Sequence, residues 1–167
     1  MANEIINRVA NSKLVVFDLE DYYPEGKRIV FDIKDWLYEG FVLREKEFRA
    51  LVKAHHWLQY KDAFIALTCT TDAIVPDWAY MLLTIQLEPY AKKTVLGNLE
   101  SLESSLYQDI INTLDVSTYK DSPIIIKGCS KKPVPSSAYI MITNKLKPVA
   151  KSIMFGEACS AVPLHKR

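Results

Sequence analysis

The sequence is poor in glycine and has no excess of one charge. Among its 167 residues are five glycines, and the net charge is +1. None of the glycine-rich phosphate-binding motifs occurs, so a nucleotide-binding fold of the usual kind is not expected. A nearly neutral chain without a long basic run also has no electrostatic footprint for nucleic acid or anionic lipid. We therefore expect neither nucleic acid nor a membrane as a partner.

Long hydrophobic runs and paired cysteines are missing as well. No run approaches the roughly 20 apolar residues that cross a bilayer. Residues 1–10 include Glu4 and Arg8 and lack the apolar core of a signal peptide. This predicts a cytoplasmic protein. The three cysteines cannot all pair with one another, and in a reducing compartment they are expected to be thiols or metal ligands.

What is present is an ordinary globular composition with an internal repeat. Hydrophobic residues make up 49% of the chain and charged residues 25%, enough for one core without staples. Residues 60–97 align without gaps on residues 119–156, with fourteen identities that include Tyr60/Tyr119, Pro76/Pro135 and Gly97/Gly156. We therefore expect a single α/β domain over residues 1–167, built around this duplication.

Each copy of the repeat predicts a strand–helix–strand unit. The strands are expected at residues 63–68 and 93–96 in the first copy and at 124–127 and 152–155 in the second, around helices at 78–91 and 137–150. Helices are also expected at residues 44–56 and 99–114. The N-terminal part predicts extra strands at residues 13–18 and 28–32 and a short helix at 33–37. The architecture expected is a mainly parallel sheet flanked by helices.

The cysteines occupy three similar loops. Cys69, Cys129 and Cys159 each follow a predicted strand, precede Ser or Thr, and lead into a Val-Pro pair. Since the carboxyl ends of parallel strands share one edge of a sheet, the three thiols are expected along that edge. Three thiolates can hold zinc with a fourth ligand, or three irons of an iron–sulfur cluster. The candidates for the fourth ligand of this metal site are Asp72, Glu157, His165, His55 and His56.

Two other interpretations of the cysteines stay open. All three could be buried apolar thiols in a structural or partner-binding module, because free cysteine is among the most buried residue types. Alternatively, one could be a reactive thiol for sulfur transfer or redox chemistry. Tyr80 and Tyr139, which recur in the two copies, are expected to be core residues with hydrogen-bonded hydroxyls.

Three stretches carry a resemblance to a known family. They read VFDIKDWL at residues 30–37, VLREKEFR at 42–49 and AKSIMFGE at 150–157, the last running into Cys159-Ser160 and Val162-Pro163. The chain resembles, over nearly its whole length, an uncharacterised bacterial family often encoded beside genes of the SUF iron–sulfur assembly system. Ala158 departs from that family's pattern, where a proline is expected. The resemblance implies a metal or sulfur role, with iron–sulfur assembly proteins as partners. With the three cysteines, it leads us to expect an accessory protein of iron–sulfur or metal handling that holds an iron–sulfur cluster or zinc.

Overall fold

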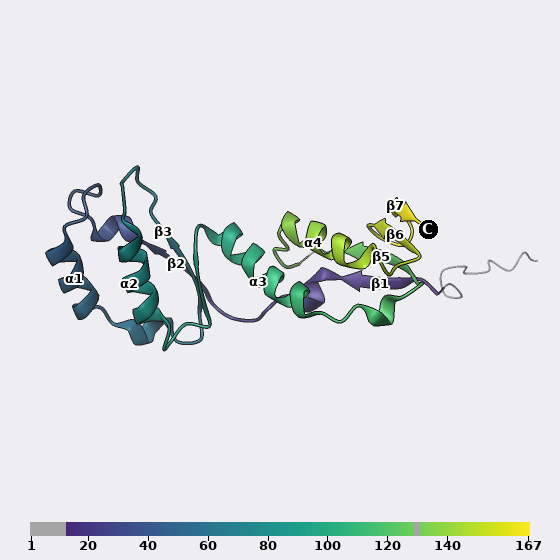
Figure 1. Cartoon of the computed structure of the whole chain (residues 1–167), viewed down its shortest axis with the longest axis horizontal. Helices are drawn as coiled ribbons and strands as arrows, with labels where there is room; N and C mark the ends of the chain where they lie inside the picture. The colour runs from purple at the N-terminus through teal and green to yellow at the C-terminus, as the bar shows by residue number, and fades with distance from the viewer. Residues whose placement is uncertain (1–12, 129–130) are drawn as a thin grey trace, which may run out of the picture. The chain divides into compact units, whose positions relative to one another are not determined.

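The computed structural model describes residues 13–128 and 131–167, and these form two compact α/β units (Figure 1). Unit 1 combines Met1–Tyr23 with Leu106–Arg167, and unit 2 is the continuous segment Pro24–Ser105. The predicted α/β class, with mainly parallel strands and extra N-terminal strands, is confirmed. The assignment of residues 1–167 to one domain stays a prediction.

Unit 2 contains a three-stranded parallel sheet in the order β2-β3-β4. Its elements in chain order are β2 (Arg28–Asp32), the 3-10 helix η2 (Ile33–Trp36), α1 (Glu45–Ala54), the 3-10 helix η3 (Trp57–Tyr60), β3 (Phe64–Thr68), α2 (Asp77–Leu87) and β4 (Lys93–Leu96). Helix α3 (Leu99–Thr113) follows and runs past the boundary between the units.

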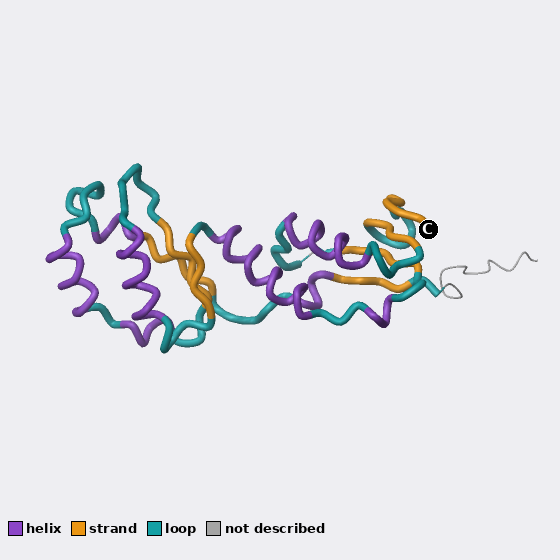
Figure 2. The backbone as a smooth tube through the Cα atoms, viewed as in Figure 1, coloured by secondary structure: helices purple, strands orange, loops and turns teal. Residues whose placement is uncertain are grey.

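Unit 1 contains a four-stranded sheet in the order β1-β5-β6-β7. Its remaining elements are β1 (Val15–Asp18), the 3-10 helix η1 (Leu19–Tyr22), the 3-10 helix η4 (Ser117–Tyr119), β5 (Pro123–Lys127), α4 (Ser136–Leu146), β6 (Ser152–Phe155) and β7 (Val162–Lys166). The first three strands are parallel, and β7 is antiparallel to β6. Figure 2 shows each sheet in orange with its helices in purple.

The two aligned segments have the same local structure at several equivalent residues. Helices α2 and α4 begin directly after Pro76 and Pro135, whose fixed φ suits a helix start. The equivalent residues Asp62 and Asp121 both have positive φ, at 59° and 55°. The residues buried from α2 are Ala79, Leu83 and Leu87, and those buried from α4 are their equivalents Ala138, Ile142 and Leu146.

The duplication also includes the two N-terminal strands. The triplet Val16-Phe17-Asp18 of β1 returns as Val30-Phe31-Asp32 in β2, and each strand leads directly into a 3-10 helix. Phe17 pairs with Ile126 of β5, and Phe31 pairs with Leu67 of β3, the equivalent residue in the repeat. Each copy of the repeat therefore forms its sheet with an N-terminal strand of its own.

This arrangement corrects the expectation of one shared sheet edge for the cysteines. Strand β3, which precedes Cys69, belongs to one sheet, and β6, which precedes Cys159, belongs to the other. The sequence pattern did not reveal this because parallel pairing of the N-terminal strands could extend either copy. Strand β7 was also missed, since Pro163 removes a ladder donor and is accepted in a strand only at a sheet edge, where β7 lies.

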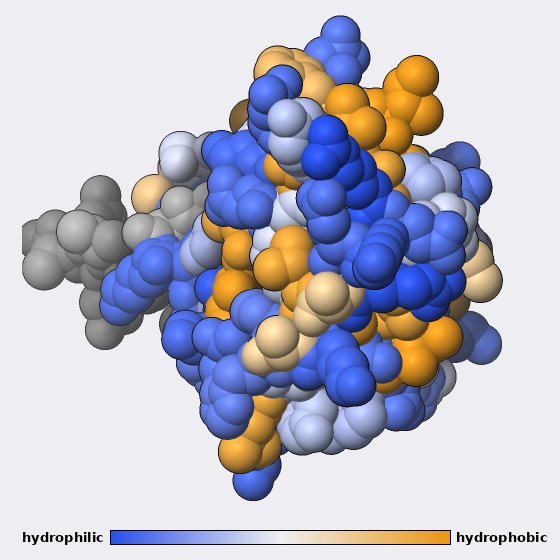
Figure 3. Space-filling view, turned by 90° about the vertical axis from the view of Figure 1, so that its left-hand side faces the viewer, coloured by the Kyte–Doolittle hydropathy of each residue, from blue (hydrophilic) through white to orange (hydrophobic). Residues whose placement is uncertain are grey.

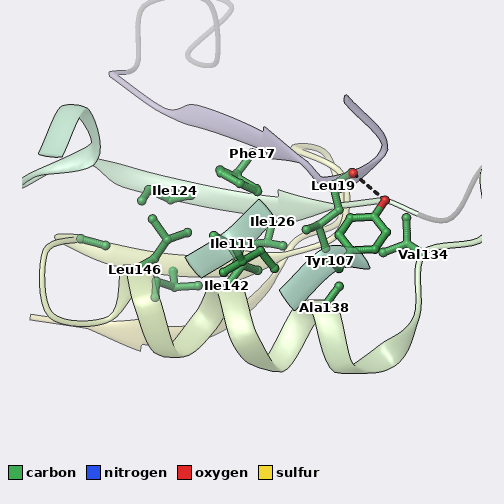
Figure 4. Close-up of a cluster of buried hydrophobic side chains, with 12 residues drawn as sticks. Phe17, Leu19, Tyr107, Ile111, Ile124, Ile126, Val134, Ala138, Ile142 and Leu146 are labelled. Atoms are coloured by element: carbon green, nitrogen blue, oxygen red, sulfur yellow. Dashed lines mark hydrogen bonds between the residues drawn. The ribbon is translucent and has the colours of Figure 1, made fainter. Parts of the chain in front are cut away.

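Each unit has its own hydrophobic core. In unit 1, Phe17, Ile124, Ile126 and Ile142 belong to one buried cluster with Tyr107, whose hydroxyl donates a 2.9 Å hydrogen bond to the carbonyl oxygen of Leu19 (Figure 4). The core of unit 2 is more aromatic, and its buried rings are Phe31, Phe48, Trp57 and Tyr60. In the part of the chain that the structure describes, no helix has both the length and the apolar character needed to span a membrane.

Candidate functional site

In unit 2, a carboxylate at the end of β2 fixes the loop that follows β3. Asp32 accepts hydrogen bonds from the backbone amides of Lys34 (3.1 Å) and Thr70 (3.2 Å) and from the Thr70 hydroxyl. Its partial burial acts to raise the pKa of Asp32, but these hydrogen bonds and the ion pair with Lys34 outweigh it, so the pKa is lowered. Asp32 therefore stays ionised and ties the Cys69-Thr70 loop to the sheet.

The thiol of Cys69 is half-buried and directly precedes Thr70, the residue that is hydrogen-bonded to Asp32. Its sulfur is 3.4 Å from the Thr71 hydroxyl oxygen and 3.6 Å from the Thr71 carbonyl oxygen. The Thr71 hydroxyl in turn donates a hydrogen bond to the carbonyl oxygen of Gly40. Burial raises the pKa of Tyr80, and the negative charges of Asp32 and Asp77 add to this effect. Tyr80 is half-buried and packs against the hydrophobic core of unit 2.

Unit 1 also has an aspartate at the end of its N-terminal strand, and this aspartate pairs with a lysine of the neighbouring strand. Asp18 caps η1 by accepting from the Glu20 amide, as Asp32 caps η2. The carboxylate of Asp18 also pairs with Lys127 Nζ at 3.2 Å, and this hydrogen bond raises the pKa of Lys127, as does the charge of Glu157. The Glu157 carboxylate lies 3.8 Å from the same ammonium group. Lys127 therefore joins β1, β5 and the loop after β6.

The sequence-predicted thiols of unit 1 follow these charged residues. Cys159 is exposed, two residues after Glu157, in the turn between β6 and β7. Cys129 lies outside the described residues, two positions after Lys127. The Lys127–Glu157 ion pair thus joins the residues that lead into both cysteine loops. The exposure of Cys159 does not fit the interpretation in which all three thiols are buried.

The fourth-ligand candidates divide between the units. Asp72, His55 and His56 belong to unit 2, while Glu157 and His165 belong to unit 1. Within residues 13–128 and 131–167, no three His, Cys, Asp or Glu side chains form a group that could hold a metal ion. His55 instead packs among aromatic rings, with Nε2 2.8 Å from the Tyr60 hydroxyl. His165 pairs with Ile153 in the β6–β7 ladder.

Sequence reasoning missed an apolar groove in unit 2, with a volume of about 570 Å³. Its apolar lining comes from the segment before α1 and from the loop that enters α2. These residues are Phe41, Val42, Leu43, Ile74, Pro76 and Trp78. The signal that could have found it is the repeat itself, because Ile74 and Trp78 correspond to Pro133 and Ser137 in the second copy.

Fold and site together define a duplicated α/β protein in which each half presents a loop with a thiol and hydroxyl groups after a parallel strand. Over residues 3–167 the chain matches the model of the family described as "Protein of unknown function (DUF2480)", and it belongs to that family. Comparisons with curated proteins and with solved structures give no match.

Proposed function

We propose that this protein is a non-catalytic accessory protein of metal or iron–sulfur handling, whose cysteine thiolates hold the cargo. The observation that carries the proposal is the ion pair of Lys127 and Glu157, which brings together the starts of the loops that contain Cys129 and Cys159. Thiolates are the ligands that zinc and iron–sulfur clusters take in proteins.

The proposed ligands are the three cysteines expected from the sequence, two of them as a primary pair and one as an additional ligand. Cys129 and Cys159 belong to unit 1, which makes them the primary pair, and Cys69 belongs to unit 2. Two thiolates leave coordination positions of a tetrahedral ion or a cluster open. Such an incomplete set suits a protein that takes up its cargo and passes it to the thiols of a partner, which is the role of an accessory factor.

The family resemblance gives a second, independent support. It associates such chains with genes of the SUF system, so the proposed partners are iron–sulfur assembly proteins and the proposed compartment is the cytoplasm. Gene order is an association and not chemistry, so the ligand assignment depends on the cysteines alone.

Anaerobic purification followed by iron, sulfide and zinc analysis tests the proposal. We expect the wild type to hold metal as purified or after reconstitution with ferrous iron and sulfide. The Cys129→Ser/Cys159→Ser variant should lose at least about nine-tenths of it, because removal of both thiolates leaves no primary ligand. Ser160→Ala is the matched control, since it changes the same exposed loop without removing a thiol.

Two results would count against this function. A wild type that stays metal-free after reconstitution would exclude metal handling by these thiols. Equal metal content in wild type and in a variant without all three cysteines would show that the metal binds elsewhere. Cys69→Ser, measured alone, assigns the third thiol: retention of metal limits the ligands to unit 1, and its loss adds Cys69 to the set.

A further inference from the structure

The apolar groove of unit 2 has walls that are themselves open to solvent. Ile74 is 94% exposed and Phe41 is 59% exposed, although both line the groove. A small-molecule pocket normally encloses most of its ligand, which such exposed walls do not do. Figure 3, which faces the α1–α2 end of unit 2, shows orange hydrophobic surfaces beside blue hydrophilic ones. Exposed apolar surface rimmed by charge is typical of a protein–protein contact.

The apolar surface continues from the groove along α2. Trp78, Met81 and Ile85 lie three and four residues apart, so they share one side of the helix. Ile85 is 65% exposed, and Met81 is likewise exposed. Trp78 packs edge-on against the buried Phe48, and its ring lies 5.2 Å from the guanidinium carbon of the exposed Arg49. A stripe at this spacing matches the apolar face of a second helix.

The internal repeat shows that the fold does not require these apolar residues. Unit 1 has Pro133, Ser137 and Asn144 where unit 2 has Ile74, Trp78 and Ile85, and helix α4 forms with the same length and the same buried face as α2. Met81 has an equally exposed apolar equivalent in Ile140. Ile74, Trp78 and Ile85, in contrast, are replaced by polar or smaller residues while the helix keeps the same length, so these three side chains need another explanation. Binding of a partner provides one.

Two carboxylates at the groove, those of Asp72 and Asp77, would attract a positively charged side chain of a partner. Glu45, which lines the groove, is paired with Arg49, and Glu47 is paired with Arg44. Among the described residues no ion pair involves Asp72, which also lines the groove. The exposed Asp77 lies between the lining residues Pro76 and Trp78.

These two carboxylates also belong to unit 2 alone. The equivalents of Asp72 and Asp77 in unit 1 are Lys131 and Ser136. The negative charge is therefore confined to the copy that carries the apolar stripe.

We propose that this surface binds an amphipathic helical segment of a partner protein, with an apolar stripe flanked by lysine or arginine. The stripe packs on Trp78, Met81 and Ile85 and fills the groove, and the basic side chains meet Asp72 and Asp77. Aromatic residues at the centre of an interface usually carry most of the binding energy, which assigns that role to Trp78. The surface acts independently of the thiols proposed to bind metal.

The test uses the full chain and a fluorescein-labelled synthetic helix of about four turns, with a leucine stripe flanked by lysines. Binding is measured by fluorescence anisotropy. Two further peptides serve as probes of specificity, one with glutamate in place of every lysine and one with the leucine stripe scrambled. We expect the lysine peptide to bind at least about tenfold more tightly than either, because only it matches both the charge and the stripe.

Variants that copy unit 1 into unit 2 locate the surface. Ile74→Pro combined with Ile85→Asn should weaken binding about tenfold, since two apolar contacts are removed. Both side chains are exposed, so this variant does not depend on Trp78, whose replacement could disturb the packing on Phe48. Asp72→Lys should remove most of the preference for the lysine peptide over the glutamate peptide. Ile140→Ser is the matched control in unit 1, where the side chain is 64% exposed, and it should leave binding unchanged.

Three outcomes would overturn the proposal. The glutamate peptide could bind as tightly as the lysine peptide, or the Ile74/Ile85 variant could bind as the wild type does. The protein could also form a dimer that the same substitutions dissolve, as measured by light scattering, which would assign the groove to a second copy of this chain. Metal content in the Ile74→Pro/Ile85→Asn variant should equal that of the wild type, so failure here leaves the thiol proposal standing.

Discussion

Units 1 and 2 share a core of three parallel strands in the same register, to which unit 1 adds the antiparallel β7, yet they expose different chemistry. Unit 1 exposes a cysteine loop beside a charged network, while unit 2 exposes an apolar groove and keeps its thiol half-buried. The residues that agree between the copies are those that the fold needs, such as Leu87/Leu146 in the cores. The residues that differ, such as Trp78/Ser137, identify where each copy has acquired a task of its own.

The largest loss of stability is expected when equivalent core residues of the two units are substituted. Leu83→Ala in unit 2 and Ile142→Ala in unit 1 each remove a fully buried side chain, which costs about 2–5 kcal/mol of the free energy of unfolding. All three tryptophans, Trp36, Trp57 and Trp78, lie in unit 2. In urea titrations, Leu83→Ala should therefore shift the tryptophan fluorescence midpoint, and Ile142→Ala mainly the circular dichroism transition.

The control for this comparison is Ile140→Ser, which changes an exposed side chain on the same helix as Ile142 and should alter neither midpoint by more than about 0.5 kcal/mol. If both core substitutions move both signals equally, the two units unfold as one cooperative body, and the comparison between them does not extend to stability.

A smaller effect is expected from the two aspartates that cap the 3-10 helices. Asp32→Ala should cost about 1–2 kcal/mol, and Asp18→Ala about 1 kcal/mol, because only Asp32 also accepts two hydrogen bonds from Thr70. Thermal unfolding followed by circular dichroism measures both. Thr70→Val should reproduce part of the Asp32 effect and add little to it in the double variant. Equal losses for the two aspartates would contradict the role given to Thr70.

The smallest expected change in stability is the pH-dependent contribution of His55, whose equivalent in unit 1 is Leu114. Burial lowers the pKa of His55 below its ordinary value, and the neighbouring His56 lowers it further. The unfolded chain then binds the proton more tightly than the folded one. The stability that this group contributes is present above about pH 6.5 and decreases as the pH falls through the lowered pKa. His55→Leu, which copies unit 1, should remove this part of the pH dependence in urea titrations between about pH 5 and 8. An unchanged pH profile would show that His55 is not its source.

Much of the fold follows from the sequence because local pattern and tertiary structure agree. Strands β2, β4 and β6 have the predicted bounds, and α2 and α4 begin within one residue of the prediction. The proline before each helix and the glycine after each second strand fix these limits. The predicted ends of these helices are too late, because Pro89 and Pro148 stop the regular backbone earlier than the apolar pattern does.

The candidate site was less predictable because it depends on which strands pair. Cys69, Cys129 and Cys159 look alike in sequence, but the loop of each takes its surroundings from the neighbouring strand, and β1 and β2 were assigned to no sheet in advance. The groove of unit 2 was missed because its lining comes from two separate segments of the chain, residues 41–45 and 72–78, and the periodicity within one segment does not show that the two meet. Comparing the two copies position by position provides the missing information.

The order of the strands along the chain has a consequence for how the protein is made. Unit 2 is a continuous segment, so all its parts have been synthesised once Ser105 is added. Strand β1, in contrast, pairs with β5, which is translated only after the whole of unit 2. Since non-local pairing is slow and exposes apolar strands meanwhile, β1 waits for its partner. During synthesis the sheet of unit 2 can thus be completed before that of unit 1, although β1 precedes every strand of unit 2.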